Sequence, residues 1–171
     1  MKIVNIVITV KLPSELDLDF LNSQLKNSSR HSKHHWLKFR IPTDNSYIAF
    51  YKSGKFLMTV KSFEQADRNM KYVLSLLKKV NIPTKGSQST IHNIVLSDNF
   101  ESHISLEKLV AFLDRDKASY EPEQFPALIF KDNGVCFLIF STGKMIITGS
   151  KTIQQGEERI KEFKDLIKKM K

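Results

Sequence analysis

The sequence repeats itself at an offset of 88 or 89 residues, and this internal repeat limits the possible folds more than any other feature. Three short matches carry the alignment: VNIV at 4–7 with HNIV at 92–95, Ser53-Gly54-Lys55 with Thr142-Gly143-Lys144, and Met58-Thr59 with Ile147-Thr148. A short segment rich in Pro, Gly and Ser, residues 83–89, separates the halves. The sequence therefore predicts two related domains, residues 1–85 and residues 86–171.

Hydrophobic periodicity predicts the same order of elements in both halves: a strand, a helix, three strands and a long helix. In the first half we expect a strand at 3–11, a helix at 17–26, a loop at 27–35, strands at 36–41, 46–51 and 56–60, and a helix at 63–80. In the second half we expect a strand at 90–96, a helix at 106–114, three strands within 125–149 and a helix at 153–170. Each long helix starts with a capping box, Ser62 with Gln65 and Thr152 with Gln155. Helices on one face of an antiparallel sheet give an α+β fold.

The alternation within the strands also assigns residues to the two faces of the sheet. Apolar residues such as Ile6 and Ile8 are expected under the helices. The opposite, open face combines apolar, Asn, Thr and Lys side chains; it carries Asn5, Val7, Thr9, Ala49, Tyr51, Lys55, Leu57 and Thr59 in the first half, and Asn93, Val95, Ser97, Leu138, Phe140, Lys144, Ile146 and Thr148 in the second. A solvated face is normally more polar than this.

Two interpretations of the open face follow from the residues. A second layer of protein, such as a dimer partner, could cover it. Alternatively it could bind the minor groove of DNA, where A·T acceptors suit Asn and Thr, sugar edges tolerate apolar contacts and phosphates attract Lys. The residues alone favour the two interpretations about equally.

The net charge of +9 lies entirely in the first half. Residues 1–85 contain fifteen Lys and Arg against six Asp and Glu, whereas residues 86–171 contain twelve of each kind. A basic half is typical of a protein that binds a polyanion, although an acidic protein or a membrane surface would suit it equally.

Composition argues against several classes of protein. No apolar run is long enough to span a bilayer, and residues 1–10 alternate like a strand rather than a signal peptide. The single cysteine, Cys136, excludes an internal disulfide and favours an intracellular setting. The sequence contains no phosphate-binding glycine loop, nucleophile motif or metal-spaced Cys/His set, so we expect neither an enzyme nor a cofactor. Cys136 is expected to be a packing residue in a buried strand.

Three segments resemble the C-terminal repeat of the TATA-box-binding protein family: YEPEQFP at 120–126, FSTGK at 140–144 and ITGSK at 147–151. This resemblance implies a saddle, in which two tandem repeats form one curved ten-stranded antiparallel sheet with helices on the convex face. It also implies a general transcription initiation factor that binds and bends a TATA-like element, acting with transcription factor B and, indirectly, RNA polymerase. We therefore expect an intracellular, DNA-associated protein, in an archaeal cytoplasm or a nucleus.

The resemblance assigns DNA contacts to the open face. Hydrogen bonds to bases would come from Asn5, Asn93, Thr59 and Thr148, apolar contacts from Val7, Val95, Leu57, Ile146, Ala49 and Leu138, and phosphate contacts from Lys55, Lys144, Lys131 and Lys151, with Thr9 and Ser97 beside them. In the family, one aromatic pair per repeat wedges between base steps. Phe125 and Phe140 match one pair. For the other pair we expect Tyr51 with Trp36, because Trp36 precedes Tyr51 by fifteen residues, just as Phe125 precedes Phe140. Phe39 is the alternative partner of Tyr51.

The first repeat departs from the family pattern at residues 29–35, SRHSKHH, where the family has an acidic, proline-bearing loop. Glu121 and Glu123 of the second repeat resemble the contacts for transcription factor B, so we expect that surface at one end only. His31, His34 and His35 are expected to form a solvated basic loop rather than a metal site, because no cysteine or carboxylate accompanies them.

Three hypotheses remain. The leading one is a general initiation factor of this family. The second is a specialised relative with weak or altered DNA binding, because Trp36 and Tyr51 each carry a polar atom that suits a dry base stack poorly. The third is a protein-interaction module that uses the open face, including a homodimer formed without DNA.

Overall fold

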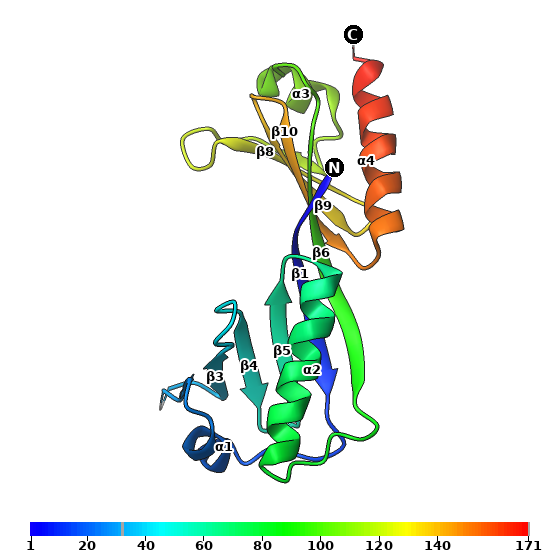
Figure 1. Cartoon of the computed structure of the whole chain (residues 1–171). Coiled ribbons are helices and arrows are strands. Elements are labelled where there is room, and N and C mark those ends of the chain that lie inside the picture. The colour runs from blue at the N-terminus through cyan, green and yellow to red at the C-terminus, as the bar shows by residue number, and fades with distance from the viewer. Residues whose placement is uncertain (32, 171) are drawn as a thin grey trace. The chain divides into compact units, whose positions relative to one another are not determined.

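The computed structural model describes residues 1–31 and 33–170 (Figure 1); Ser32 of the expected basic loop and Lys171 lie outside the described residues. The chain divides into two compact units, one of Asn5–His92 and one of Met1–Val4 with the residues from Asn93 onward. These bounds differ from those of the two sequence repeats, residues 1–85 and 86–171. No helix in the described part is long and apolar enough to cross a membrane.

The first repeat contains five strands and two helices. They are β1 (Lys2–Lys11), α1 (Leu18–Gln24), β2 (Ser28–Ser29), β3 (Trp36–Arg40), β4 (Tyr47–Tyr51), β5 (Lys55–Val60) and α2 (Phe63–Lys79). The expected order is confirmed, with one addition. The expected loop at 27–35 contains β2, which pairs with β3 through Ser28 opposite Phe39 and Ser29 opposite Lys38.

The second repeat has the same order. Its elements are β6 (Gln88–Asn99), α3 (Leu106–Phe112), β7 (Ala118–Ser119), β8 (Ala127–Asp132), β9 (Val135–Phe140), β10 (Lys144–Ser150) and α4 (Ile153–Lys168). The strands form one ten-stranded sheet in the order β2-β3-β4-β5-β1-β6-β10-β9-β8-β7. The predicted α+β class with ten antiparallel strands is therefore confirmed.

Equivalent hydrogen bonds support the duplication at the level of the backbone. The N–H of Leu12 donates to the carbonyl of Gly54 at 2.7 Å, and the N–H of Phe100 donates to the carbonyl of Gly143 at 3.0 Å. In each repeat the chain leaving the first strand is thus tied to the turn before the last strand.

The long helices cover one face of the strands in each unit (Figure 1). In the first repeat Phe50 and Phe56 are at most 1% exposed, and Val73 and Leu77 of α2 are fully buried. In the second repeat the ring of Phe163 on α4 stacks on Phe137 at a centroid distance of 4.6 Å. Replacing a core phenylalanine with alanine typically costs about 3–5 kcal/mol, so these contacts hold each helix to its strands.

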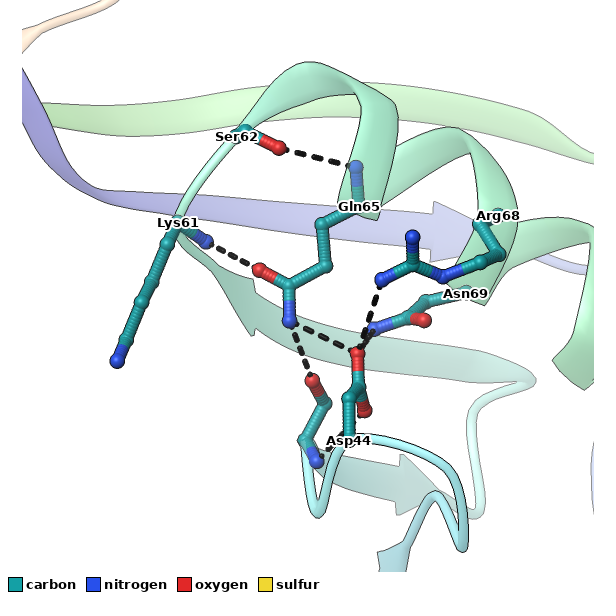
Figure 2. Close-up of polar contacts among 7 residues, drawn as sticks. Asp44, Lys61, Ser62, Gln65, Arg68 and Asn69 are labelled. Atoms are coloured by element: carbon teal, nitrogen blue, oxygen red, sulfur yellow. Dashed lines mark hydrogen bonds and ion pairs between the residues drawn. The ribbon is translucent and has the colours of Figure 1, made fainter.

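Both predicted capping boxes are confirmed. The Ser62 hydroxyl accepts from the N–H of Gln65 at 3.1 Å, and the Gln65 side chain accepts from the N–H of Lys61 at 2.8 Å (Figure 2). Thr152 and Gln155 make the equivalent bond at the start of α4, also at 3.1 Å. Free N–H groups at both helix starts are thereby satisfied.

Asp44 anchors the turn between β3 and β4 to α2 (Figure 2). Its carboxylate accepts from the side chains of Gln65 at 2.8 Å and Asn69 at 3.1 Å and from the N–H of Ser46 at 3.0 Å. Arg68 lies 3.5 Å away as an ion-pair partner. Partial burial alone would raise the pKa of Asp44, but the bonds from Gln65, Ser46 and Asn69 outweigh it and hold the pKa well below its usual range.

Candidate nucleic-acid interface

The open face of the second repeat is built by cross-strand rows of residues. Ser97 lies opposite Ile146, and Ile146 lies opposite Leu138. Directly opposed residues share a face, so this row is common to β6, β10 and β9. Its side chains are half-buried, whereas Ile147 and Ile139 on the helix side have no exposed surface. The face is therefore apolar but accessible.

Asn93 and Thr148 meet on this face beside a β-bulge. Nδ2 of Asn93 lies 3.0 Å from the hydroxyl of Thr148, and Oδ1 of Asn93 accepts from the N–H of Gly149 at 2.7 Å. The register between β10 and β6 shifts between Ile147 and Ser150, which places one extra residue on β10. Because a backbone N–H can only donate, the amide oxygen must face Gly149, and Nδ2 must face outward from that bond.

The bulge requires glycine at residue 149. Gly149 has φ +100°, and a Cβ there would lie 2.6 Å from the carbonyl oxygen of Gly134. Val60, the equivalent residue in the first repeat, is 1% exposed and faces the helix side. In the first repeat β1 and β5 pair without a bulge, from Lys11 opposite Lys55 to Ile6 opposite Val60. The sequence difference between Gly149 and Val60 thus marks a bulge in one repeat and regular pairing in the other.

The open face of the first repeat has equivalent rows. Thr9 lies opposite Leu57, and Leu57 lies opposite Ala49. Val7 lies opposite Thr59, so alternation along β1 places Asn5 on the same face. Ala49 is only 2% exposed between its longer row neighbours. The predicted open-face residues of each repeat therefore share one face of their own strands, although Ala49 offers almost no surface.

An aromatic pair lies at the end of each of these faces. The rings of Phe125 and Phe140 are 6.4 Å apart at an interplanar angle of 64°, and Phe125 is 40% exposed. The rings of Trp36 and Tyr51 are 6.5 Å apart at 43°, and both are half-buried. The sequence prediction that Trp36 lies beside Tyr51 is correct.

The predicted equivalence of Trp36 with Phe125 is wrong, because Trp36 lies directly opposite Tyr51, and the residue directly opposite Phe140 is Ala127. Phe125 precedes that position by two residues, so its counterpart is His34. The equal spacing of fifteen residues misled the alignment: the β3–β4 turn spans residues 41–46, whereas the β8–β9 turn spans only residues 133–134.

The alternative wedge, Phe39, is also wrong. Phe39 lies opposite Ile48, is 2% exposed, and has its ring 6.2 Å from that of Phe50. It belongs to the core under the helices and cannot reach the open face.

Cationic side chains surround the open faces. Lys55, Lys144, Lys131 and Lys151, predicted to contact phosphates, are all exposed. Two further cations were missed: Lys38 lies opposite Ala49, and Arg40 lies opposite Tyr47 with its guanidinium 5.2 Å from the tyrosine ring centre. Lys38 and Arg40 follow Trp36 at every second residue of β3, and this alternation in the sequence could have placed them on the same face.

The loops before β3 and β8 carry opposite charges. Glu121 and Glu123 are exposed in residues 120–126, where the N–H of Phe125 donates to the carbonyl of Glu121 at 2.9 Å. The loop at residues 30–35 carries His31, His34 and His35 instead. Among the residues that the structure describes, no three His, Cys, Asp or Glu side chains are grouped to hold a metal ion.

Cys136 lies on the open face and not in the core as predicted. It is half-buried in β9, opposite Lys131 on one side and Thr148 on the other. Partial burial raises the pKa of its thiol more than the charge of Lys131 lowers it, so the thiol stays protonated at neutral pH. Such a thiol is a poor nucleophile.

Comparison with known proteins places the chain in a family. The family model described as transcription factor TFIID (or TATA-binding protein, TBP) matches residues 1–80 and 88–170. The TATA-box-binding protein of Aeropyrum pernix is 37% identical over 94% of this chain and 81% of its own length. TATA-box-binding protein C of Halobacterium salinarum is 29% identical over 99% of this chain and 98% of its own length. The solved structure of Methanococcus jannaschii TBP superposes with a TM-score of 0.89, with 29% identity and 98% of each chain covered. The chain is therefore a member of the TATA-box-binding protein family.

Proposed function

We propose that this protein is a non-enzymatic transcription initiation factor that binds A·T-rich promoter DNA through the minor groove with its open sheet face. The names of its relatives, which are TATA-box-binding proteins, support this function. The open faces supply the chemistry, because they combine apolar rows, amide and hydroxyl groups, and a surrounding set of lysines. Its place in the cell would accordingly be on the genome.

The observation that carries the proposal is the fixed amide of Asn93. Its oxygen is used by Gly149 and one N–H points to Thr148, so the second N–H of Nδ2 is the group offered to DNA. In the minor groove, A·T pairs present only acceptors, adenine N3 and thymine O2, whereas guanine adds an N–H donor. A fixed donor therefore favours A·T pairs and opposes G·C pairs.

Lysines around the apolar rows would neutralise phosphates. Lys55 and Lys144 begin β5 and β10 at equivalent positions of the two repeats, and both are exposed. Each neutralised phosphate makes the logarithm of the binding constant fall by about 0.9 per tenfold increase in salt. Binding should therefore depend strongly on ionic strength.

DNA bending would come from the aromatic pairs. Phe125 and Phe140 are apolar rings in contact, and Phe125 is exposed enough to enter a base step. Partial unstacking of a step by an apolar wedge kinks the duplex towards the major groove. We assign this role to the second repeat first.

Recruitment of transcription factor B, and of RNA polymerase through it, would use Glu121 and Glu123. Both carboxylates are exposed in a loop whose backbone bonds back to the carbonyl of Glu121. The equivalent loop of the first repeat is basic. A partner that needs carboxylates would therefore bind beside β8 and not beside β3.

A second candidate function is that of a specialised relative with weak or altered DNA binding. The observation that favours it is the first repeat's aromatic site, where Trp36 takes the position of Ala127 and no phenylalanine pair forms. A weaker wedge at that site would reduce bending without removing binding.

Fluorescence anisotropy with two matched duplexes tests the proposal. One duplex carries a central A·T-rich element, and in the control the same positions are G·C. We expect a preference of at least about tenfold for the A·T duplex and a steep loss of affinity with salt. Absence of binding at low salt would reject DNA binding and leave the protein-interaction module, for which sedimentation would then test homodimer formation. Equal binding to both duplexes would reject minor-groove readout by Asn93.

A further inference from the structure

His34 occupies, in the first repeat, the place that Phe125 occupies in the second. Trp36 lies opposite Tyr51, as Ala127 lies opposite Phe140, and each loop residue precedes its strand start by two positions. Both are held by a backbone turn: the N–H of His34 donates to the carbonyl of His31, and the N–H of Phe125 donates to that of Glu121, both at 2.9 Å. An ionisable ring thus replaces an apolar one.

The rings around His34 form a stack. The imidazole of His34 lies on the indole of Trp36 at a centroid distance of 4.3 Å and an interplanar angle of 23°. The indole is in turn 6.5 Å from Tyr51. In the second repeat the small Ala127 leaves room for Phe125 and Phe140 to approach each other, whereas Trp36 fills that room and lies between its two neighbours.

The loop that carries His34 is attached at its start to both α1 and β3. Arg30 forms an ion pair with Asp19 of α1, and Ser29 pairs with Lys38 of β3. His34 itself is exposed. It is therefore held near the end of the open face while its ring nitrogens remain accessible.

Charged side chains from five segments line the two hollows beside His34. The cations and histidines are Arg30, His31, His35, Lys38, Arg40 and Lys52. The acids are Glu15, Asp17 and Asp19, of which Asp17 caps α1 and Asp19 pairs with Arg30. Four fixed cations, Arg30, Lys38, Arg40 and Lys52, thus stand against three acids around His34, which leaves a small excess of positive charge to attract a phosphate.

We propose that His34 is a DNA-contacting residue whose imidazolium binds a phosphate at the end of the first repeat's open face. This repeat would then bind DNA more tightly as the pH falls. The inference rests on the proposed DNA-binding function. A neutral imidazole offers one N–H, and the charged form offers two together with a positive charge.

The test is an anisotropy titration of the A·T-rich duplex from pH 8 to pH 5.5 at constant ionic strength, with the full chain. We expect the wild type to bind about threefold to tenfold more tightly at pH 5.5, and its salt slope to steepen by about 0.9, one extra phosphate. His34→Phe should remove most of both changes and increase the bend, because it restores the ring type of Phe125. His103→Phe, at an exposed histidine of the second repeat, should keep the wild-type response.

Thermal melting of both variants tests whether they fold like the wild type. A His34→Phe variant that retains the wild-type pH response would overturn the inference, as would a wild type whose affinity is independent of pH. If the wild type binds neither duplex at any pH, the proposed function itself fails, and that result differs from binding that is strong but unaffected by pH.

Discussion

Asn93 and Thr148 fix each other across two adjacent strands, with Nδ2 of the amide 3.0 Å from the hydroxyl, while the N–H of Gly149 binds the amide oxygen at 2.7 Å. The amide therefore has one orientation before any ligand arrives. A group that is already oriented loses less conformational entropy on binding, which increases the affinity that its contact can contribute.

Asn93→Asp should separate DNA binding from folding. The carboxylate keeps an oxygen for Gly149 and another for the Thr148 hydroxyl, but it has no N–H and adds a negative charge. We expect binding to the A·T-rich duplex to weaken by about 1–3 kcal/mol, measured by anisotropy, with little change in the melting temperature. Asn81→Asp, an exposed site after α2, adds the same charge as a control. Unchanged affinity in Asn93→Asp would show that the donor is not used.

Gly149→Ala should destabilise the fold more than Gly134→Ala. Both glycines have positive φ, at +100° and +81°, but only at residue 149 would the added methyl group collide, 2.6 Å from a carbonyl oxygen. We expect about 1–2 kcal/mol for Gly134→Ala from the backbone conformation. Gly149→Ala should cost about 1–3 kcal/mol more from the collision. Urea unfolding of both variants measures the difference, and equal losses would argue against the bulge.

Asp44→Asn should make stability less dependent on pH. The pKa of Asp44 is depressed in the folded protein, so its carboxylate stabilises the fold above the unfolded-state pKa of about 4, and this contribution is lost as the pH falls through the folded-state pKa. We expect Asp44→Asn to lower the free energy of unfolding by about 1–3 kcal/mol at pH 7 and by clearly less at pH 3. Asp67→Asn, which removes an exposed pair with Lys71, is the control and should cost less than about 1 kcal/mol.

Phe140→Ala should reduce DNA bending more than Tyr51→Ala. Phe140 contacts the exposed Phe125, whereas Tyr51 has Trp36 between it and His34. Energy transfer between dyes at the two ends of a duplex measures the bend. Equal reductions would mean that both repeats wedge equally, which would remove the reason to regard the protein as a specialised relative.

Replacing both Glu121 and Glu123 with Lys should abolish recruitment of transcription factor B and leave DNA affinity at least as high. These exposed carboxylates are the only contacts that we assign to that partner, and added lysines cannot weaken attraction to phosphates. A supershift assay with and without transcription factor B measures both effects. Glu157→Lys with Glu158→Lys, exposed on α4, makes the same change in net charge and should recruit normally.

Most of the fold could be predicted from the sequence because its signals are local. The two capping boxes and the alternation of β1 are each encoded within a few residues, and the structure confirms them. The two-residue strands β2 and β7 have no periodicity of their own, since pairing with β3 and β8 is what defines them. Their presence followed only from the family resemblance.

The candidate site was harder to predict where it depends on pairing between strands. The bulge at Gly149 is invisible until β10 is set against β6, and the shift of Trp36 relative to Phe125 is hidden by a long turn in one repeat and a short one in the other. The number of residues between two positions in the sequence reveals neither the bulge nor this shift. The face that a residue occupies was predictable for most positions, Cys136 being the exception, whereas the residue directly opposite it on the next strand was not.

The contrast between Ala127 and Trp36 has a consequence for how duplicated proteins diverge. Once the indole of Trp36 fills the space beside Tyr51, the residue beyond it, His34, no longer has to provide apolar surface for packing. That position becomes free to hold a group with different chemistry while the backbone plan stays intact. One enlarged side chain can thereby free a neighbour from its original packing role, so that the two repeats of a pseudo-symmetric molecule come to differ in chemistry.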